Sequence, residues 1–169
     1  MGSFISFIPT PFDEVDNFFA LAPASADDVV YDLGCGDGRL LFAALEKGAG
    51  KAVGVDLGPE QIREAKETAI KKGFANRVSV LQADVMDVDL SPATLILCYL
   101  ISAASRALKP KFEAELKPGT RIVMESFPVP GWRPLETRQD SYYGKTFYLY
   151  KMPSEPMNEE ALELLYPGY

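Results

Sequence analysis

A chain of 169 residues that is 47% hydrophobic and 24% charged has an ordinary globular composition, and its length favours one domain. The formal net charge of −7 argues against nucleic acid as a partner, and no apolar run approaches the roughly 20 residues that span a bilayer. The absence of histidine excludes Ser-His and Cys-His nucleophiles and histidine-based metal sites. Cys35 and Cys98 form no ligand spacing, so we expect no metal and a reducing, cytoplasmic setting.

Residues 1–26 are expected to form an N-terminal aromatic cover segment. Pro9-Thr10-Pro11 cannot be helical, but a helix can begin near Asp13. Phenylalanines are frequent on both sides of this element, and the apolar side chains of the predicted helix share one face: Val15, Phe18, Phe19 and Ala22. We expect the segment either to fill one end of the core or to cover a bound ligand.

Residues 29–39 (VVYDLGCGDGR) are the most informative stretch of the chain. An apolar run containing Asp32 leads into glycines at 34, 36 and 38, and apolar residues at helical spacing follow, which predicts a strand, a tight loop and a helix. Glycine permits positive φ and close approach to a ligand, and the first N–H groups of the helix point to the same place. The loop is therefore expected to hold a polar ligand, although a structural glycine-rich turn could give a similar string.

Two further predicted strands, 52–56 and 78–84, end in Asp56 and Asp84. Together with Asp32, these carboxylates would lie along the edge where open α/β sheets bind ligands. Asp56 is placed to grip the two hydroxyls of a ribose, and its alternative role is to cap the helix that Pro59 opens. Asp84, between Ala83 and Val85, could accept a hydrogen bond from an exocyclic amine such as that of adenine.

The remaining pattern predicts a helix over 59–72, strands over 94–100 and 120–126, and between them a helix over 102–116 interrupted at Pro110. Strands over 135–140 and 146–152 around a glycine-bearing turn then predict a hairpin. Five βα-type strands and a hairpin give one α/β domain over 1–152. Residues 153–169 are predicted to form an acidic C-terminal tail with one or two helical turns at 159–165.

The glycine spacing does not fit a dinucleotide fingerprint, since position 39 is arginine, and no P-loop motif occurs. Residues 32–38 instead resemble the first motif of class I, seven-stranded S-adenosylmethionine-dependent methyltransferases, and the resemblance extends over residues 27–152. It implies a three-layer, Rossmann-like α/β fold with parallel strands one to five and a C-terminal antiparallel hairpin. It also implies S-adenosyl-L-methionine as cofactor. The cofactor-binding residues would be Thr10, Asp32, Gly34, Gly36, Asp37, Asp56, Leu57, Asp84 and Val85.

Four short segments together carry a narrower resemblance: Pro9-Thr10-Pro11, residues 32–39, residues 88–90 (VDL) and residues 127–132 (FPVPGW). They are similar to the small archaeal protein-lysine methyltransferases and their mitochondrial relatives. This implies in-line methyl transfer to lysine amines, with proteins that carry basic or lysine-bearing surfaces as partners. We expect a monomer.

The fourth predicted strand ends in LCYL, without a strongly polar residue and without the [ND]PP[YFW] motif of adenine and glutamine methyltransferases. A lysine acceptor must lose its charge, which an apolar, aromatic channel favours. Tyr99 is our catalytic candidate to line that channel, with Phe7, Phe127 and Trp132 as candidate walls, whereas an ordinary core tyrosine is the alternative for Tyr99. A small-molecule methyltransferase and an inactive cofactor-binding partner subunit remain as alternative functions.

Overall fold

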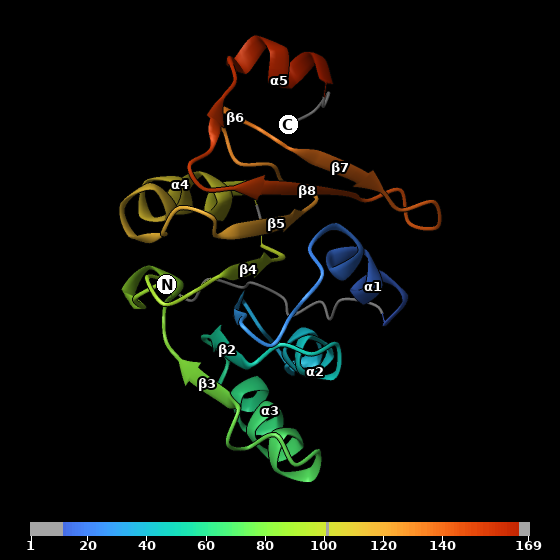
Figure 1. Ribbon diagram of the computed structural model, residues 1–169, viewed down its shortest axis with the longest axis vertical. Helices are drawn as coiled ribbons and strands as arrows, with labels where there is room; N and C mark the ends of the chain where they lie inside the picture. The colour runs from blue at the N-terminus through green and yellow to red at the C-terminus, as the bar shows by residue number, and fades with distance from the viewer. Residues whose placement is uncertain (1–11, 101, 166–169) are drawn as a thin grey trace.

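The structure is a computed structural model that describes residues 12–100 and 102–165 (Figure 1). Seven strands form one sheet in the order β3-β2-β1-β4-β5-β8-β7. Five are parallel: β1 (Val29–Leu33), β2 (Lys51–Asp56), β3 (Val78–Gln82), β4 (Leu95–Cys98) and β5 (Arg121–Glu125). The hairpin of β7 (Glu136–Gln139) and β8 (Thr146–Lys151) extends the sheet antiparallel to β5. The predicted seven-stranded α/β fold is confirmed.

Helices cover both faces of this sheet. Buried side chains of α1 (Phe12–Leu21), α2 (Arg39–Glu46) and α3 (Pro59–Lys71) belong to one core cluster, and those of α4 (Ser102–Glu115) belong to a second. The remaining helices are the short 3-10 helix η1 (Val85–Asp87) and α5 (Glu159–Leu165). Among the described residues, no helix is long and apolar enough to cross a membrane.

Strand β4 shows how the sheet separates the two clusters. Leu95 and Leu97 belong to the first cluster, and Ile96 and Cys98 belong to the second; all four are fully buried. A strand buried on both faces forms a continuous apolar run, which is why the sequence here shows no alternation.

Strands β2 and β3 lie on one side of β1, and the chain then crosses to the other side of β1, where β4 pairs with it. This reversal creates a switch point between the carboxyl ends of β1 and β4, the place where open α/β sheets bind ligands. Figure 1 shows the strands stepping from β3 at one end of the sheet to β7 at the other, with α1 near the end of the hairpin.

Two predictions about the second half of the chain differ from the structure. The expected interruption at Pro110 is wrong, because α4 continues through it. Pro110 is exposed, while Leu108 and Phe112 are fully buried, so the packing of α4 compensates the backbone hydrogen bond that proline removes.

The second difference is a small sheet that the sequence did not reveal. Strand β6 (Trp132–Arg133), which lies between the predicted strands over 120–126 and 135–140, pairs with β9 (Glu155–Pro156), in the acidic tail. The backbone N–H of Met157 also donates to the carbonyl of Gly131, at 2.7 Å. Two-residue strands are too short to show a sequence period, so only the tertiary structure identifies them.

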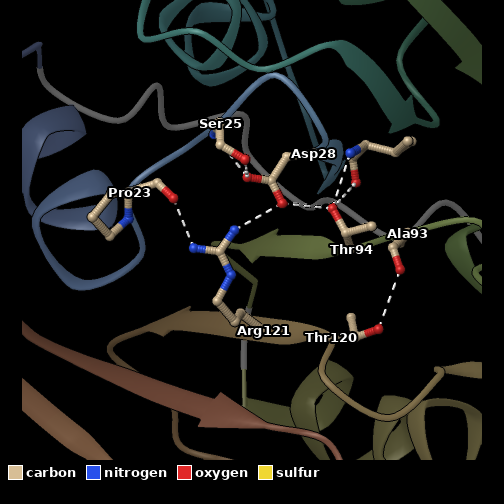
Figure 2. A network of polar contacts seen from close by, with 8 residues as sticks. Pro23, Ser25, Asp28, Ala93, Thr94, Thr120 and Arg121 are labelled. Atoms are coloured by element: carbon tan, nitrogen blue, oxygen red, sulfur yellow. Dashed lines mark hydrogen bonds and ion pairs between the residues drawn. The ribbon is translucent and has the colours of Figure 1, made fainter.

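A polar network closes the opposite edge of the sheet, where the parallel strands begin (Figure 2). Asp28 accepts hydrogen bonds from the Thr94 hydroxyl at 2.7 Å, from Arg121 at 2.8 Å and from the Ser25 backbone at 2.8 Å. Arg121 also donates to the carbonyl of Pro23 at 2.7 Å. Burial alone would raise the pKa of Asp28, but these bonds outweigh it and lower the pKa. The polar side chains at this edge therefore bond to groups of the chain itself, and the edge where the parallel strands end remains for ligands.

Candidate functional site

The glycine loop after β1 has the conformation that its sequence predicts. Gly34, Gly36 and Gly38 all have positive φ, at 85°, 53° and 84°. A Cβ built on Gly34 would lie 2.7 Å from the side chain of Leu100, so a side chain is excluded by contact as well as by φ. The loop is therefore a bare-backbone cradle at the start of α2, shaped to receive a ligand closely.

Asp56, at the end of β2, is held rigidly beside this cradle. Its Oδ2 accepts from the N–H of Gly36 at 2.9 Å, and its Oδ1 accepts from the N–H of Gly58 at 2.8 Å. The N-cap position of α3 is Gly58, so capping does not account for Asp56. Each carboxylate oxygen keeps a second lone pair, and the side chain is partly exposed, so a ligand diol can still be bound.

Asp32 lies under the loop and is almost completely buried. Burial raises its pKa to about 8, and the negative charges of Asp56 and Asp37 add to this shift. Asp37 itself is paired with Arg39, whose Nε donates to Oδ1 at 3.0 Å. The structure thus gathers three predicted site carboxyl groups around one loop, with Asp32 protonated at neutral pH and Asp37 paired with Arg39.

The third acidic position lies one strand further out. Strand β3 ends at Gln82, two residues earlier than predicted, and Asp84 caps η1 by accepting from the N–H of Met86 at 2.9 Å. The N–H of Ala83 donates to the carbonyl of Asp56 at 3.0 Å, which joins the ends of β2 and β3.

Apolar side chains flank this junction. Leu57 is 57% exposed, and Val85 is partly buried against the second core cluster. An exposed leucine beside a carboxylate suits a planar ring with amino substituents, such as a purine base.

Tyr99 follows β4 and lies against the glycine cradle. Its carbonyl oxygen is 3.9 Å from a Cβ built on Gly34. Its ring carries the ammonium group of Lys145, with Nζ 4.7 Å from the ring centre, and its hydroxyl lies 3.5 Å from the same Nζ. Tyr99 therefore contacts the cation of a lysine that belongs to the same chain.

The other predicted wall residues have different outcomes. Trp132 is a core residue, so its assignment to the channel is wrong: it packs against Phe112 and Tyr150, and its indole donates to Glu113 at 3.2 Å. The turns around Trp132 fold it back over α4, which the sequence did not indicate. Phe127 is partly buried just beyond β5, and Thr10 and Phe7 lie outside the described residues.

Sequence reasoning missed three charged residues beside Tyr99: Glu14, Glu125 and Lys145. Lys145 Nζ lies 2.8 Å from Glu14 and 2.8 Å from Glu125, and both glutamates are 0% exposed. A signal was present, since Glu125 ends a strand in an acid like Asp32 and Asp56, and Glu14 lies on the apolar face of α1. Nothing in the sequence connected them to Lys145.

A seven-stranded sheet with an antiparallel hairpin, a glycine cradle after β1 and an acid that ends β2 define the class I methyltransferase architecture. Residues 32–136 match the ANTKMT methyltransferase domain. The chain belongs to this methyltransferase family.

Curated relatives and solved structures agree with this assignment. A protein-lysine N-methyltransferase of Saccharolobus islandicus is 42% identical over 149 residues, which cover 86% of this chain and 92% of that protein. The adenine nucleotide translocase lysine N-methyltransferase of Mus musculus is 32% identical over 122 residues, covering 72% of this chain and 53% of that protein. The match thus spans about half the length of the mouse relative.

Among solved structures, an RNA methyltransferase from Salinibacter ruber in complex with S-adenosyl-L-homocysteine superposes with a TM-score of 0.84. It is 33% identical, and the match covers 90% of this chain and 99% of that chain. The C-terminal domain of precorrin-6Y C5,15-methyltransferase from Rhodobacter capsulatus is 16% identical with a TM-score of 0.67, which shows a shared fold alone.

Proposed function

We propose that this protein transfers a methyl group from S-adenosylmethionine to the side-chain amine of lysine residues in proteins. The observation that carries the proposal is Tyr99, which borders the glycine cradle and holds a lysine ammonium against its ring. The name and extensive match of the Saccharolobus islandicus relative support the same acceptor. On this proposal the enzyme acts as a monomer in the cytoplasm on basic, lysine-bearing proteins.

The residues at the carboxyl edge fit the cofactor. The glycine cradle would take the amino-acid part, and the two-oxygen face of Asp56 would take the ribose. Leu57 and Val85 would flank the adenine, and Asp84 would accept from its amine. When bound, the cofactor supplies both an electrophilic methyl group and a neutral thioether leaving group, so in-line attack by an amine needs no metal or histidine.

The task of the protein is to deliver a neutral amine to the right place. An unperturbed lysine has a pKa of about 10.4, so its deprotonation at neutral pH costs roughly 4 to 5 kcal/mol. An apolar channel disfavours the charged form of the amine, and orientation against the cradle reduces the entropic barrier of attack.

RNA is the competing acceptor, because the solved relative at 33% identity is described as an RNA methyltransferase. The net charge of −7 argues against it, since the phosphate backbone is bound chiefly through lysine and arginine. Two further functions compete with the proposal: methyl transfer to a small molecule, and cofactor binding in an inactive partner subunit.

The test is incubation with methyl-labelled S-adenosylmethionine and either a basic protein mixture or total RNA, followed by digestion and mass spectrometry. We expect the label on lysine side chains. The Asp56→Ala variant should lose the transfer, and the Asp27→Ala variant, which changes an exposed acid at the opposite edge, should keep it. Label on arginine, on carboxylates or on RNA, or cofactor binding without any transfer, would contradict the proposal.

A further inference from the structure

Lys145 sits at the centre of a cluster formed by Glu14 on α1, Tyr99 after β4 and Glu125 at the end of β5. We call these four residues the Lys145 cluster. The Nζ atom of Lys145 lies 2.8 Å from Glu14 Oε2, 2.8 Å from Glu125 Oε1 and 4.7 Å from the centre of the Tyr99 ring. Two carboxylates and an aromatic face are the groups that bind an alkylammonium ion.

The cluster offers more hydrogen-bond acceptors than Lys145 uses. Within the part of the chain that the structure describes, two buried oxygens of the cluster receive no hydrogen bond, Glu14 Oε1 and Glu125 Oε2, while Glu125 Oε1 pairs with Lys145 at 2.8 Å. One ammonium group also faces two buried carboxyl groups. Buried acceptors without donors are costly and rare, so these oxygens point to a ligand that brings N–H groups and positive charge.

The cluster also lies where an acceptor must bind. Tyr99 borders the glycine cradle through its backbone, and Glu125 ends the strand next to β4. Lys145 comes from the turn between β7 and β8, and its side chain is 23% exposed while both glutamates are wholly buried. Its side chain therefore leads from the surface to the buried carboxylates, as a lysine from another protein would have to do.

Lys145 is not the only link between α1 and the hairpin. Asn17 donates to Asp140 at 2.8 Å and accepts from Arg138 at 2.8 Å, and Asp140 accepts from two backbone N–H groups of the turn. The turn therefore keeps its shape and its contact with α1 when Lys145 changes partner. This leaves Lys145 able to act in something other than anchoring.

We propose that Glu14, Glu125 and Tyr99 form the receptor for the ammonium group of the acceptor lysine, and that Lys145 is an internal occupant which the acceptor lysine displaces. This inference rests on the proposed function and names the residues that recognise its acceptor. Displacement exchanges one lysine for another, so the buried carboxylates keep a cation throughout.

The state of Glu125 supports the proposal. Burial raises its pKa to about 7; the Lys145 charge opposes the shift, and Glu14 and Asp140 add to it. Burial alone would lower the pKa of the Lys145 ammonium group, but its hydrogen bonds to Glu125 and Glu14 outweigh burial and raise the pKa, so the cluster binds a lysine in its charged form.

Steady-state kinetics with poly-L-lysine as acceptor probe test the proposal. Lys145→Met removes the competing cation but keeps an unbranched side chain. KM for poly-L-lysine should then fall roughly fivefold, because in the wild type only the receptors that Lys145 leaves free can bind the acceptor. Glu125→Gln and Glu14→Gln should each raise KM about tenfold, the cost of one charged hydrogen bond, with unchanged affinity for S-adenosylhomocysteine. Lys151→Met, an exposed lysine at the other end of β8, is the matched control and should change neither value.

A lower kcat at unchanged or raised KM in Lys145→Met would overturn the proposal, since it would identify a structural ion pair. If that variant does not fold, brief acetylation of the wild-type protein tests the same point. The ratio of Lys145 acetylation to Lys151 acetylation should rise when poly-L-lysine is present. An unchanged ratio would overturn displacement. Wild-type turnover on lysine with unaltered variants would reject only this inference, whereas absence of any transfer to lysine would reject the proposed function.

Discussion

Replacing Asp32 by asparagine should make the protein more stable at neutral pH. The pKa of Asp32 is raised to about 8 in the folded chain, against about 3.9 in the unfolded chain. Between these values the folded state holds a proton that the unfolded state has released, so the free energy of unfolding falls as pH rises. At pH 7 the penalty is set by the interval of about 3 units between the unfolded pKa of about 3.9 and the pH, which corresponds to at most about 4 kcal/mol. Asp32→Asn should therefore recover about 1 to 4 kcal/mol.

Urea unfolding followed by the fluorescence of Trp132, the single tryptophan, measures this effect. The wild-type protein should lose stability steadily between about pH 5 and 8, whereas Asp32→Asn should lose much less, and the two should converge near pH 4. Asp27→Asn, which changes an exposed acid, is the control. Equal pH slopes for wild type and Asp32→Asn, or a variant that is less stable at every pH, would refute the reasoning. A carboxyl group kept where an amide is more stable is typical of a functional site.

Three further predictions concern the two edges of the sheet. Asp56→Ala should weaken S-adenosylhomocysteine binding by at least about 1.5 kcal/mol in calorimetry; an unchanged affinity in a folded variant would remove Asp56 from the site. Gly34→Ala should lower the free energy of unfolding by about 1 to 3 kcal/mol, because of its φ of 85° and the contact with Leu100; a neutral result in urea titration would contradict this. Arg121→Ala should cost about 1 to 3 kcal/mol at pH 7, and this cost should shrink as the pH falls below about 3.9 towards the lowered pKa of Asp28; a cost that stays the same as the pH falls through this range would argue against the ion pair.

Much of the fold was predictable because its signals are local. The strand, glycine loop and helix over residues 29–46 follow from an apolar run, positive-φ glycines and helical spacing within one short segment. The alternation of strands and helices then places the ends of β1, β2 and β3 on one edge, because parallel strands joined by crossovers point the same way. Asp32, Asp56 and Asp84 could therefore be assigned to one site without coordinates.

The sequence alone determined the class of fold, the cradle and the acids that border it, since each depends on neighbours in the chain. Only the tertiary structure showed that Lys145 contacts Glu14, 131 residues away, that Trp132 lies in the core and that β6 pairs with β9. Backbone periodicity specifies which side of an element is buried, but not which distant charge will meet it. The partners of a buried charge are decided by how whole layers pack, because only packing brings residues so far apart in the chain within hydrogen-bond distance.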